Sequence, residues 1–286
     1  MHVPVLLKET VEYLNPEGNK NFIDCTAGAG GHSLEILGNI NQGRILSIDA
    51  NPLAVQKLKE RIIDSKINFV CGNFSNLKEL VKKNNFYPVD GILFDLGLSS
   101  ELLEESGLGF SFMRQEKLDM RFNPEVQTVT ATEIVNHFSK DDLTKVFKNY
   151  GGERFYKRIA EKIVWERQKQ EIIFSSQLVD IVKESLGRYF HIKSLARVFQ
   201  ALRICVNKEL EALEEGLSSA LEILAPKGRL VVISYHSLED KIVKNFFREQ
   251  KQRLNILTKK PIVPSNVEIG KNKKSRSAKL RAAEVK

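Results

Sequence analysis

Asp95 is the residue whose type and position most strongly indicate chemistry. It ends the apolar run 89–94 and is followed by Leu96-Gly97-Leu98-Ser99-Ser100. Open α/β sheets bind ligands where their parallel strands end, so this pattern places a hydrogen-bond acceptor and a closely packed backbone at a ligand site. The alternative is a strand-end turn with a solvated Asp95.

Glycine, acidic and aromatic markers follow three earlier apolar runs. They are the turn Ala27-Gly28-Ala29-Gly30-Gly31, then Asp49, then Phe74. Such glycines let the backbone approach a ligand, and an Asp about twenty residues further on can accept both hydroxyls of a ribose. This predicts an adenosine-containing cofactor, with Phe74 either against its purine or in the core. Ser33 stands where the dinucleotide fingerprint has its third glycine.

A parallel sheet is needed to bring these markers together. Strands are expected at 22–26, 44–48, 67–71, 89–94 and 229–234, and helices at 32–37, 52–63, 75–83 and 209–224. Strands that alternate with helices of this length indicate βαβ units. The predicted fold class is therefore α/β, with a doubly wound, Rossmann-like sheet.

The alternation stops after residue 100. Helices are expected there at 132–138, 140–149, 154–169, 175–186 and 194–206. We therefore predict a core formed by residues 1–100 and 207–250, an inserted helical domain at 101–206, and a basic tail at 251–286.

The positive charge is concentrated in that tail. Residues 251–286 hold 11 basic and 2 acidic side chains, so their charge of +9 exceeds the net +8 of the whole chain. The segment 271–281 is typical of chains that neutralise phosphates and become ordered on contact with nucleic acid. A solvated, disordered terminus is the alternative.

Composition excludes several other classes. Cys25, Cys71 and Cys205 are odd in number and widely spaced, which argues against a disulfide framework, and the five histidines show no metal-ligand spacing. The start of the chain lacks a basic signal region, and no apolar run approaches the length of a membrane span. We expect a soluble cytoplasmic protein that has no metal and no membrane partner; a homodimer is one assembly the sequence permits.

Eight motifs occur in a fixed order along almost the whole chain. They are His2-Val3-Pro4-Val5-Leu6-Leu7, Gly30-Gly31-His32-Ser33, Asp90-Gly91-Ile92-Leu93-Phe94-Asp95-Leu96-Gly97, Gly109-Phe110-Ser111-Phe112, Leu118-Asp119-Met120-Arg121, Phe199-Gln200-Ala201-Leu202-Arg203-Ile204, Ser234-Tyr235-His236-Ser237-Leu238-Glu239-Asp240 and Arg276-Ser277-Ala278-Lys279-Leu280-Arg281. With these motifs the chain resembles the RsmH (MraW) family, the small-subunit (16S) ribosomal RNA cytosine-N4 methyltransferases.

This resemblance implies a class I methyltransferase that uses S-adenosyl-L-methionine, with 16S rRNA in the small ribosomal subunit as its partner. The resemblance implies cofactor contacts at Gly30, Gly31, His32, Asp49, Phe74 and Asp95. Gly28 of the glycine turn is a further candidate contact.

The implied reaction defines what the protein must add. The lone pair of a cytosine amino group is delocalised into the ring, so an acceptor has to draw an N–H out of the ring plane. Asp95, or the backbone carbonyls that follow it, are in the right place for this. His236 and Ser237 follow the fifth strand and could position the base at the same rim, although His236 could equally tie down the strand-to-helix turn.

Candidate substrate contacts lie in the insert and just after it. Asp119, Arg121, Arg203 and Asn207 could hold phosphate or base, or could pair within the insert. The helix 154–169 has a basic face that carries Trp165, the single tryptophan. Basic side chains around an aromatic ring suit a splayed-out RNA base; burial of Trp165 against a neighbouring helix is the alternative.

The chain departs from the family at Glu101-Leu102, where the family has Pro-Gln and assigns the glutamine to the cofactor. Two other functions remain open. The strand-end acids would also suit an NAD-dependent oxidoreductase, and weakened cofactor binding would leave a non-catalytic, RNA-binding ribosome-assembly protein.

Overall fold

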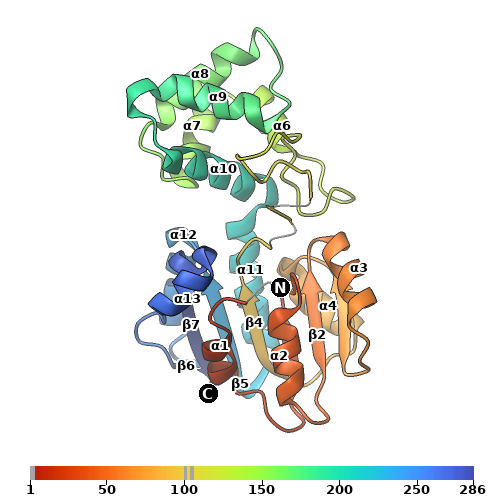
Figure 1. Cartoon of the computed structure of the whole chain (residues 1–286). Helices are drawn as coiled ribbons and strands as arrows, with labels where there is room; N and C mark the ends of the chain where they lie inside the picture. The colour runs from red at the N-terminus through yellow and green to blue at the C-terminus, as the bar shows by residue number, and fades with distance from the viewer. Residues whose placement is uncertain (1–3, 100–101, 104–105) are drawn as a thin grey trace. The chain divides into compact units, whose positions relative to one another are not determined.

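A computed structural model describes residues 4–99, 102–103 and 106–286. These residues form two compact units, which we call unit 1 (Met1–Ser99 with Leu210–Lys286) and unit 2 (Ser100–Glu209) (Figure 1). Unit 2 thus starts one residue before the predicted insert and ends three residues after it. Within the described part of the chain, no helix has the length and apolar character needed to cross a membrane.

Unit 1 is built on a seven-stranded sheet in the order β3-β2-β1-β4-β5-β7-β6. The neighbours β3, β2, β1, β4 and β5 pair in parallel, which confirms the predicted doubly wound α/β sheet. The strand order reverses between β1 and β4, and that is where such sheets bind ligands. The parallel strands are β1 (Phe22–Asp24), β2 (Ile45–Asp49), β3 (Ile67–Cys71), β4 (Val89–Asp95) and β5 (Leu224–Ser234).

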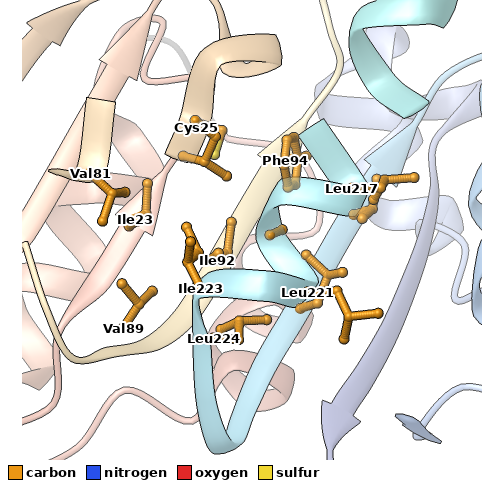
Figure 2. Packing of buried hydrophobic residues seen from close by; sticks show 14 of the residues in the cluster. Ile23, Cys25, Val81, Val89, Ile92, Phe94, Leu217, Leu221, Ile223 and Leu224 are labelled. Atoms are coloured by element: carbon orange, nitrogen blue, oxygen red, sulfur yellow. The ribbon is translucent and has the colours of Figure 1, made fainter. Parts of the chain in front are cut away.

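Helices cover both faces of this sheet. Alternate residues of β4 point to opposite faces, so Ile92 and Phe94 join one buried cluster and Leu93 joins the other. Figure 2 shows Leu217 and Leu221 of α11 in the cluster that contains Ile92 and Phe94. The cluster with Ile92 is covered by α4 (Leu77–Lys83), α11 (Glu209–Ile223) and α12 (Ser237–Glu249), and that with Leu93 by α1 (Leu7–Leu14), α2 (Gly31–Asn39) and α3 (Pro52–Arg61).

The expectation of a separate basic tail at 251–286 is wrong. The segment forms β6 (Leu254–Ile256), α13 (Asn266–Lys271), η3 (Lys273–Ser277) and β7 (Lys279–Val285), all within unit 1. β7 lies antiparallel between β5 and β6, and its Leu280 and Ala282 are buried. The charge run concealed this strand, because its apolar positions alternate with Lys279 and Arg281.

Unit 2 is helical in its described part, as expected. The helices are α6 (Ala131–His137), α7 (Lys140–Asn149), α8 (Tyr156–Arg167), α9 (Ser175–Leu186), the short η2 (Gly187–Tyr189) and α10 (Ile192–Asn207). Thr130 and Glu133 form a capping box at the start of α6. In α8, Ile159, Ala160 and Ile163 are buried.

Candidate active site

The glycine turn and Asp49 are joined directly. Gly28 has a φ of 49° and its N–H donates to Asp49 Oδ2 at 2.7 Å. The other carboxylate oxygen accepts from the Asn51 N–H at 2.8 Å. These two bonds fix the plane of the Asp49 carboxylate at the end of β2, and a carboxylate oxygen can accept more than one hydrogen bond.

Gly30 and Gly31 have packing roles. Gly30 has a φ of 79°, and a Cβ there would lie 2.7 Å from Leu58 Cδ2. A Cβ at Gly31 would overlap the ring of Pro4. Both glycines therefore let α2 start tightly against its neighbours, a role that does not require a ligand.

Ser33 explains the missing third glycine. Its hydroxyl is buried and donates to Asp24 Oδ2 at 2.7 Å, and it lies 2.8 Å from Ser47 Oγ. It thus links α2 to β1 and β2 through side-chain hydrogen bonds. Burial raises the pKa of Asp24, although the charge of His32 and the Ser33 bond oppose that effect.

Asp95 is held by side chains from two other elements. The Tyr235 hydroxyl donates to Asp95 Oδ1 at 2.8 Å. Nε2 of His32 lies 3.4 Å from Asp95 Oδ2, an ion-pair distance when the ring is protonated. The backbone N–H of Asp95 donates to Thr26 Oγ1 at 2.7 Å, which ties the end of β4 to that of β1. The carboxylate is therefore a fixed acceptor at the switch point.

Both partners of Asp95 have shifted proton affinities. Burial lowers the pKa of His32, but its interaction with the nearby Asp95 carboxylate and the charge of Asp24 outweigh it, so the pKa is raised overall. Burial, followed by the negative charge of Asp95, raises the pKa of Tyr235 well above its usual value. Tyr235 therefore remains a hydrogen-bond donor at physiological pH.

Sequence reasoning missed Tyr235. It lies between Ser234 and His236 in a motif that drew attention only to its histidine and following serine. A Cβ at Gly97 would come within 2.8 Å of Tyr235 Cε2, so the glycine of Asp95-Leu96-Gly97 makes room for this ring. The sequence shows a glycine two residues after the acidic strand end, but no local pattern places the ring of Tyr235 against it.

Phe74 is anchored to the core. Its ring packs edge to face on Phe94, with centroids 5.3 Å apart, and a Cβ at Gly216 would lie 2.9 Å from Phe74 Cδ2. The ring is partly buried against the cluster on that face of the sheet. This is the packing role that the sequence left open, and contact with a purine stays a prediction.

His236 caps α12. Its Nδ1 accepts from the Glu239 N–H at 3.4 Å, and the Glu239 carboxylate accepts from the backbone N–H groups of Tyr235 and His236. The alternative of a histidine that ties down the strand-to-helix turn thus describes its contacts. Ser237 is the first residue of this helix and is exposed.

Asp119 and Arg121 pair with each other in unit 2. Nε and Nη2 of Arg121 donate to the two oxygens of Asp119, each at 2.7 Å. Nη1 donates to the carbonyl of Gln127 at 2.7 Å. Pairing within the insert was the alternative to substrate binding, and it accounts for these contacts.

Asn207 and Arg203 also have internal partners. Asn207 is buried, accepts from the Phe122 N–H at 2.9 Å and donates to the Met120 carbonyl at 2.8 Å. Arg203 forms a two-bond pair with Glu209, with both distances 2.8 Å. Their side chains brace the loop that precedes α6 and the end of α10.

Trp165 is exposed, so the alternative of burial against a neighbouring helix is wrong. Half of its surface is accessible, and the ammonium groups of Lys162 and Lys169 lie over its ring, 4.4 and 2.9 Å from the centroid. Of the departure at Glu101-Leu102, Glu101 lies outside the described residues and Leu102 is buried.

The chemistry of these groups fits an adenosine cofactor. A carboxylate of fixed orientation at the end of β2 suits ribose hydroxyls, and Nδ1 of His32 is buried without a hydrogen-bond partner among the described residues. At the end of β4, the same sheet edge offers an oriented acceptor, Asp95, for a second reactant.

Comparisons with known proteins show which family the chain resembles. Residues 1–286 match the MraW methylase family. Ribosomal RNA small subunit methyltransferase H 1 of Acholeplasma laidlawii is 42% identical over 99% of this chain and 98% of its own. Ribosomal RNA small subunit methyltransferase H of Thermomicrobium roseum is 45% identical over 99% and 93%.

A solved rRNA methylase from Streptococcus thermophilus covers 100% of this chain and 99% of its own at 10% identity, with a TM-score of 0.46. The family match spans the whole chain and supports neither the oxidoreductase nor the non-catalytic alternative. The chain belongs to the MraW methylase family.

Proposed function

We propose that this protein methylates the N4 amino group of a cytosine in 16S rRNA, within the small ribosomal subunit. This proposal rests mainly on the Asp95 carboxylate, which accepts a hydrogen bond from the Tyr235 hydroxyl at 2.8 Å and is thereby held at the switch point of the sheet. Membership of a methylase family supports a methyl-transfer role for this acceptor.

S-adenosyl-L-methionine is the methyl donor in this proposal. When bound, it supplies a methyl carbon activated by a positively charged sulfur. Asp49 binds the ribose through its oriented carboxylate, and Gly28 gives the backbone a close approach. The other proposed contacts are Gly30, Gly31, His32, Phe74 and Asp95.

Asp95 performs the step that the amino group needs. Its carboxylate accepts an N–H of the cytosine amino group, which localises the nitrogen lone pair for in-line transfer. The nitrogen must then lose one proton, and the same carboxylate can take it. Tyr235 and His32 hold Asp95 for this by occupying its two oxygens from the protein side.

The substrate contacts are less direct. Trp165, which is exposed and lies close to the ammonium groups of Lys162 and Lys169, is proposed to stack on an RNA base. Asp119, Arg121, Arg203 and Asn207 act through the shape of the loop and helix end that they brace. His236 acts through the turn that carries Tyr235, and Ser237 is left as a direct contact at that rim.

The test is transfer of a labelled methyl group to small subunits from a strain that lacks this gene, followed by nucleoside analysis. Wild-type protein is expected to form N4-methylcytidine, and Asp95→Asn to lose a hundredfold or more of the rate, on the order of what a positioned base contributes. Glu222→Gln, which changes an exposed carboxylate of α11, is the matched control.

Formation of a different nucleoside by the wild type would overturn the proposed reaction. Full activity of Asp95→Asn would remove Asp95 from the mechanism. Calorimetry with S-adenosylmethionine and with NAD tests the cofactor separately, and binding of NAD alone would contradict the assignment.

A further inference from the structure

A layered group of four side chains lies on unit 2, where α8 begins and η2 ends. The rings of Phe155 and Tyr189 stack with centroids 5.8 Å apart and an interplanar angle of 30°. Arg154 lies over Phe155, its Cζ 5.6 Å from the centroid, and Arg188 lies over Tyr189 at 5.0 Å. We call these four residues the arginine–aromatic stack.

The stack is on the surface. Tyr189 is 50% exposed, and both arginines are exposed. The chain reaches this position because Gly187, with a φ of 51°, ends α9 and turns η2 back beside α8. An exposed tyrosine beside an arginine contributes little to a core, so burial of apolar surface does not account for it.

The surrounding charge is strongly positive. From Ser185 to Lys208 the sequence has five basic residues and no acidic one; from Leu143 to Ala160 it has five basic residues and one acidic residue. That acid, Glu153, is buried and lies 3.6 Å from Arg197.

The next acidic side chains on α8 and α9 are also paired. Glu161 lies 2.6 Å from Lys140, and Glu184 lies 3.1 Å from Lys162. Among the described residues, no ion pair joins an acid to Arg154 or Arg188. The nearby exposed cations are Lys148, Lys157, Arg158 and Lys193.

We propose that the arginine–aromatic stack is a contact site for a single-stranded segment of ribosomal RNA, an inference that rests on the proposed function. Unpaired bases stack on aromatic rings and on guanidinium planes, and the charges of Arg154, Arg188 and the surrounding cations neutralise phosphates. Duplex RNA keeps its bases inside and offers the stack only phosphates and sugars.

The stack is separate from the surface around Trp165. Phe155 and Trp165 are ten residues apart, which is about 15 Å along an α-helix. Variants can therefore change one surface and leave the other intact.

The experiment measures binding of a fluorescein-labelled, mixed-sequence RNA of about ten nucleotides, single-stranded or annealed to its complement, by anisotropy over a range of salt concentrations. Tyr189→Ala is expected to weaken single-strand binding about tenfold at every salt concentration. Tyr189→Phe keeps the ring and is expected to bind as the wild type does. Binding of the duplex should change less than twofold with either variant.

The double variant Arg154→Gln, Arg188→Gln tests the charge. Its plot of log affinity against log salt is expected to become shallower by about 1.4, since each single-strand phosphate contact contributes about 0.7 to the slope. Lys82→Gln with Lys83→Gln makes the same change of charge on α4 of unit 1 and should leave the slope unchanged. This double arginine variant also decides the matter if Tyr189→Ala does not fold.

If Tyr189→Ala and the double arginine variant both bound the single-stranded RNA as tightly as the wild type does, this proposal would be overturned. The proposed function would stand if the wild type still transferred the labelled methyl group. The proposal would also be overturned if the Tyr189→Ala variant lost binding to the small subunit but kept its affinity for RNA. The partner of the stack would then be a ribosomal protein. Failure of the proposed function appears separately, as absence of methyl transfer by the wild type.

Discussion

Asp95 owes its orientation to residues far away in the chain. Tyr235 follows it by 140 positions and His32 precedes it by 63, yet each lies at one of its carboxylate oxygens. A carboxylate held from two sides cannot rotate freely, so its remaining lone pairs point in set directions. Removal of either partner is therefore expected to lower the rate of methyl transfer as well as the stability of the fold.

Tyr235→Phe is expected to lower kcat about fivefold, the equivalent of roughly 1 kcal/mol for one hydrogen bond, with KM for S-adenosylmethionine nearly unchanged. The ring still packs against Gly97, so only the bond to Asp95 is lost. Single-turnover methyl transfer measures the effect. Tyr13→Phe, in α1 of unit 1, is the matched control, and an equal loss in that variant would contradict the assignment.

His32 is expected to make stability depend on pH. Its pKa in the folded protein is raised from 6.5, so the protonated ring contributes stability that is fully present below 6.5 and is lost as pH rises through the raised value. In urea unfolding from just below 6.5 to about pH 9, the wild type should lose more unfolding free energy than His32→Gln.

His137→Gln, which changes an exposed histidine of α6, should lose as much unfolding free energy as the wild type over the same range. Parallel curves for the wild type and His32→Gln would show that the His32 proton does not stabilise the fold.

At the residue scale, the sequence predicted where the site residues lie better than it predicted which side chains they contact. Gly28, Asp49 and Asp95 could be placed at strand ends because apolar runs stop there. The Tyr235 contact depends on β4 and β5 lying side by side, which no local pattern encodes. For Phe74 and His236 the sequence offered two roles each, and only the tertiary contacts favoured packing and capping.

At the scale of elements, β7 is locked to α12 by charge. Arg281 is 8% exposed, and its Nε donates to Asp240 Oδ1 at 2.7 Å. Lys279, more exposed, lies 3.3 Å from Oδ2 of the same carboxylate. Burial raises the pKa of Asp240, but Arg281 and Lys279 outweigh it and lower the pKa overall, so the carboxylate stays ionised.

Arg281→Met is expected to destabilise unit 1 by about 3 kcal/mol, because it leaves the Asp240 carboxylate partly buried without its closest cation. Lys279→Met should cost less than about 1 kcal/mol, as exposed pairs do. Urea unfolding followed by circular dichroism compares the two. Equal losses would mean that burial of Arg281 does not strengthen its pair.

The helices and the parallel strands could be predicted because their periodicities are regular and their ends carry Pro, Gly or capping residues. The helix expected from residue 52, for example, is α3, in which Pro52 is the first residue and Asn51 the N-cap. The strand β7 could not be predicted from the sequence. Its alternation of apolar and polar residues is masked because the polar positions carry lysine and arginine, which suggest a charged tail.

At the scale of the whole molecule, the cysteines report on the two units separately. Cys25 is buried in unit 1, where burial raises its pKa well above the usual value, whereas Cys205 is half-buried in unit 2. A cofactor that binds unit 1 stabilises that unit against opening by mass action. Thiol labelling therefore tests where the cofactor binds.

At a concentration one hundred times Kd, S-adenosylmethionine is expected to slow the labelling of Cys25 about a hundredfold, which corresponds to about 2.7 kcal/mol. Labelling of Cys205 should change by less than about twofold if unit 2 opens independently. Mass spectrometry of alkylated peptides gives both rates. Equal slowing at the two sites would contradict independent opening of the units.

The position of β7 also has a consequence for the order of synthesis. It follows every other strand along the chain, yet it lies between β5 and β6. While the chain is being translated, β5 therefore keeps an unpaired edge until residue 285 has left the exit tunnel. Unit 2 is continuous and emerges earlier, so we expect it to fold first and to wait, on the translating ribosome, for the sheet to close.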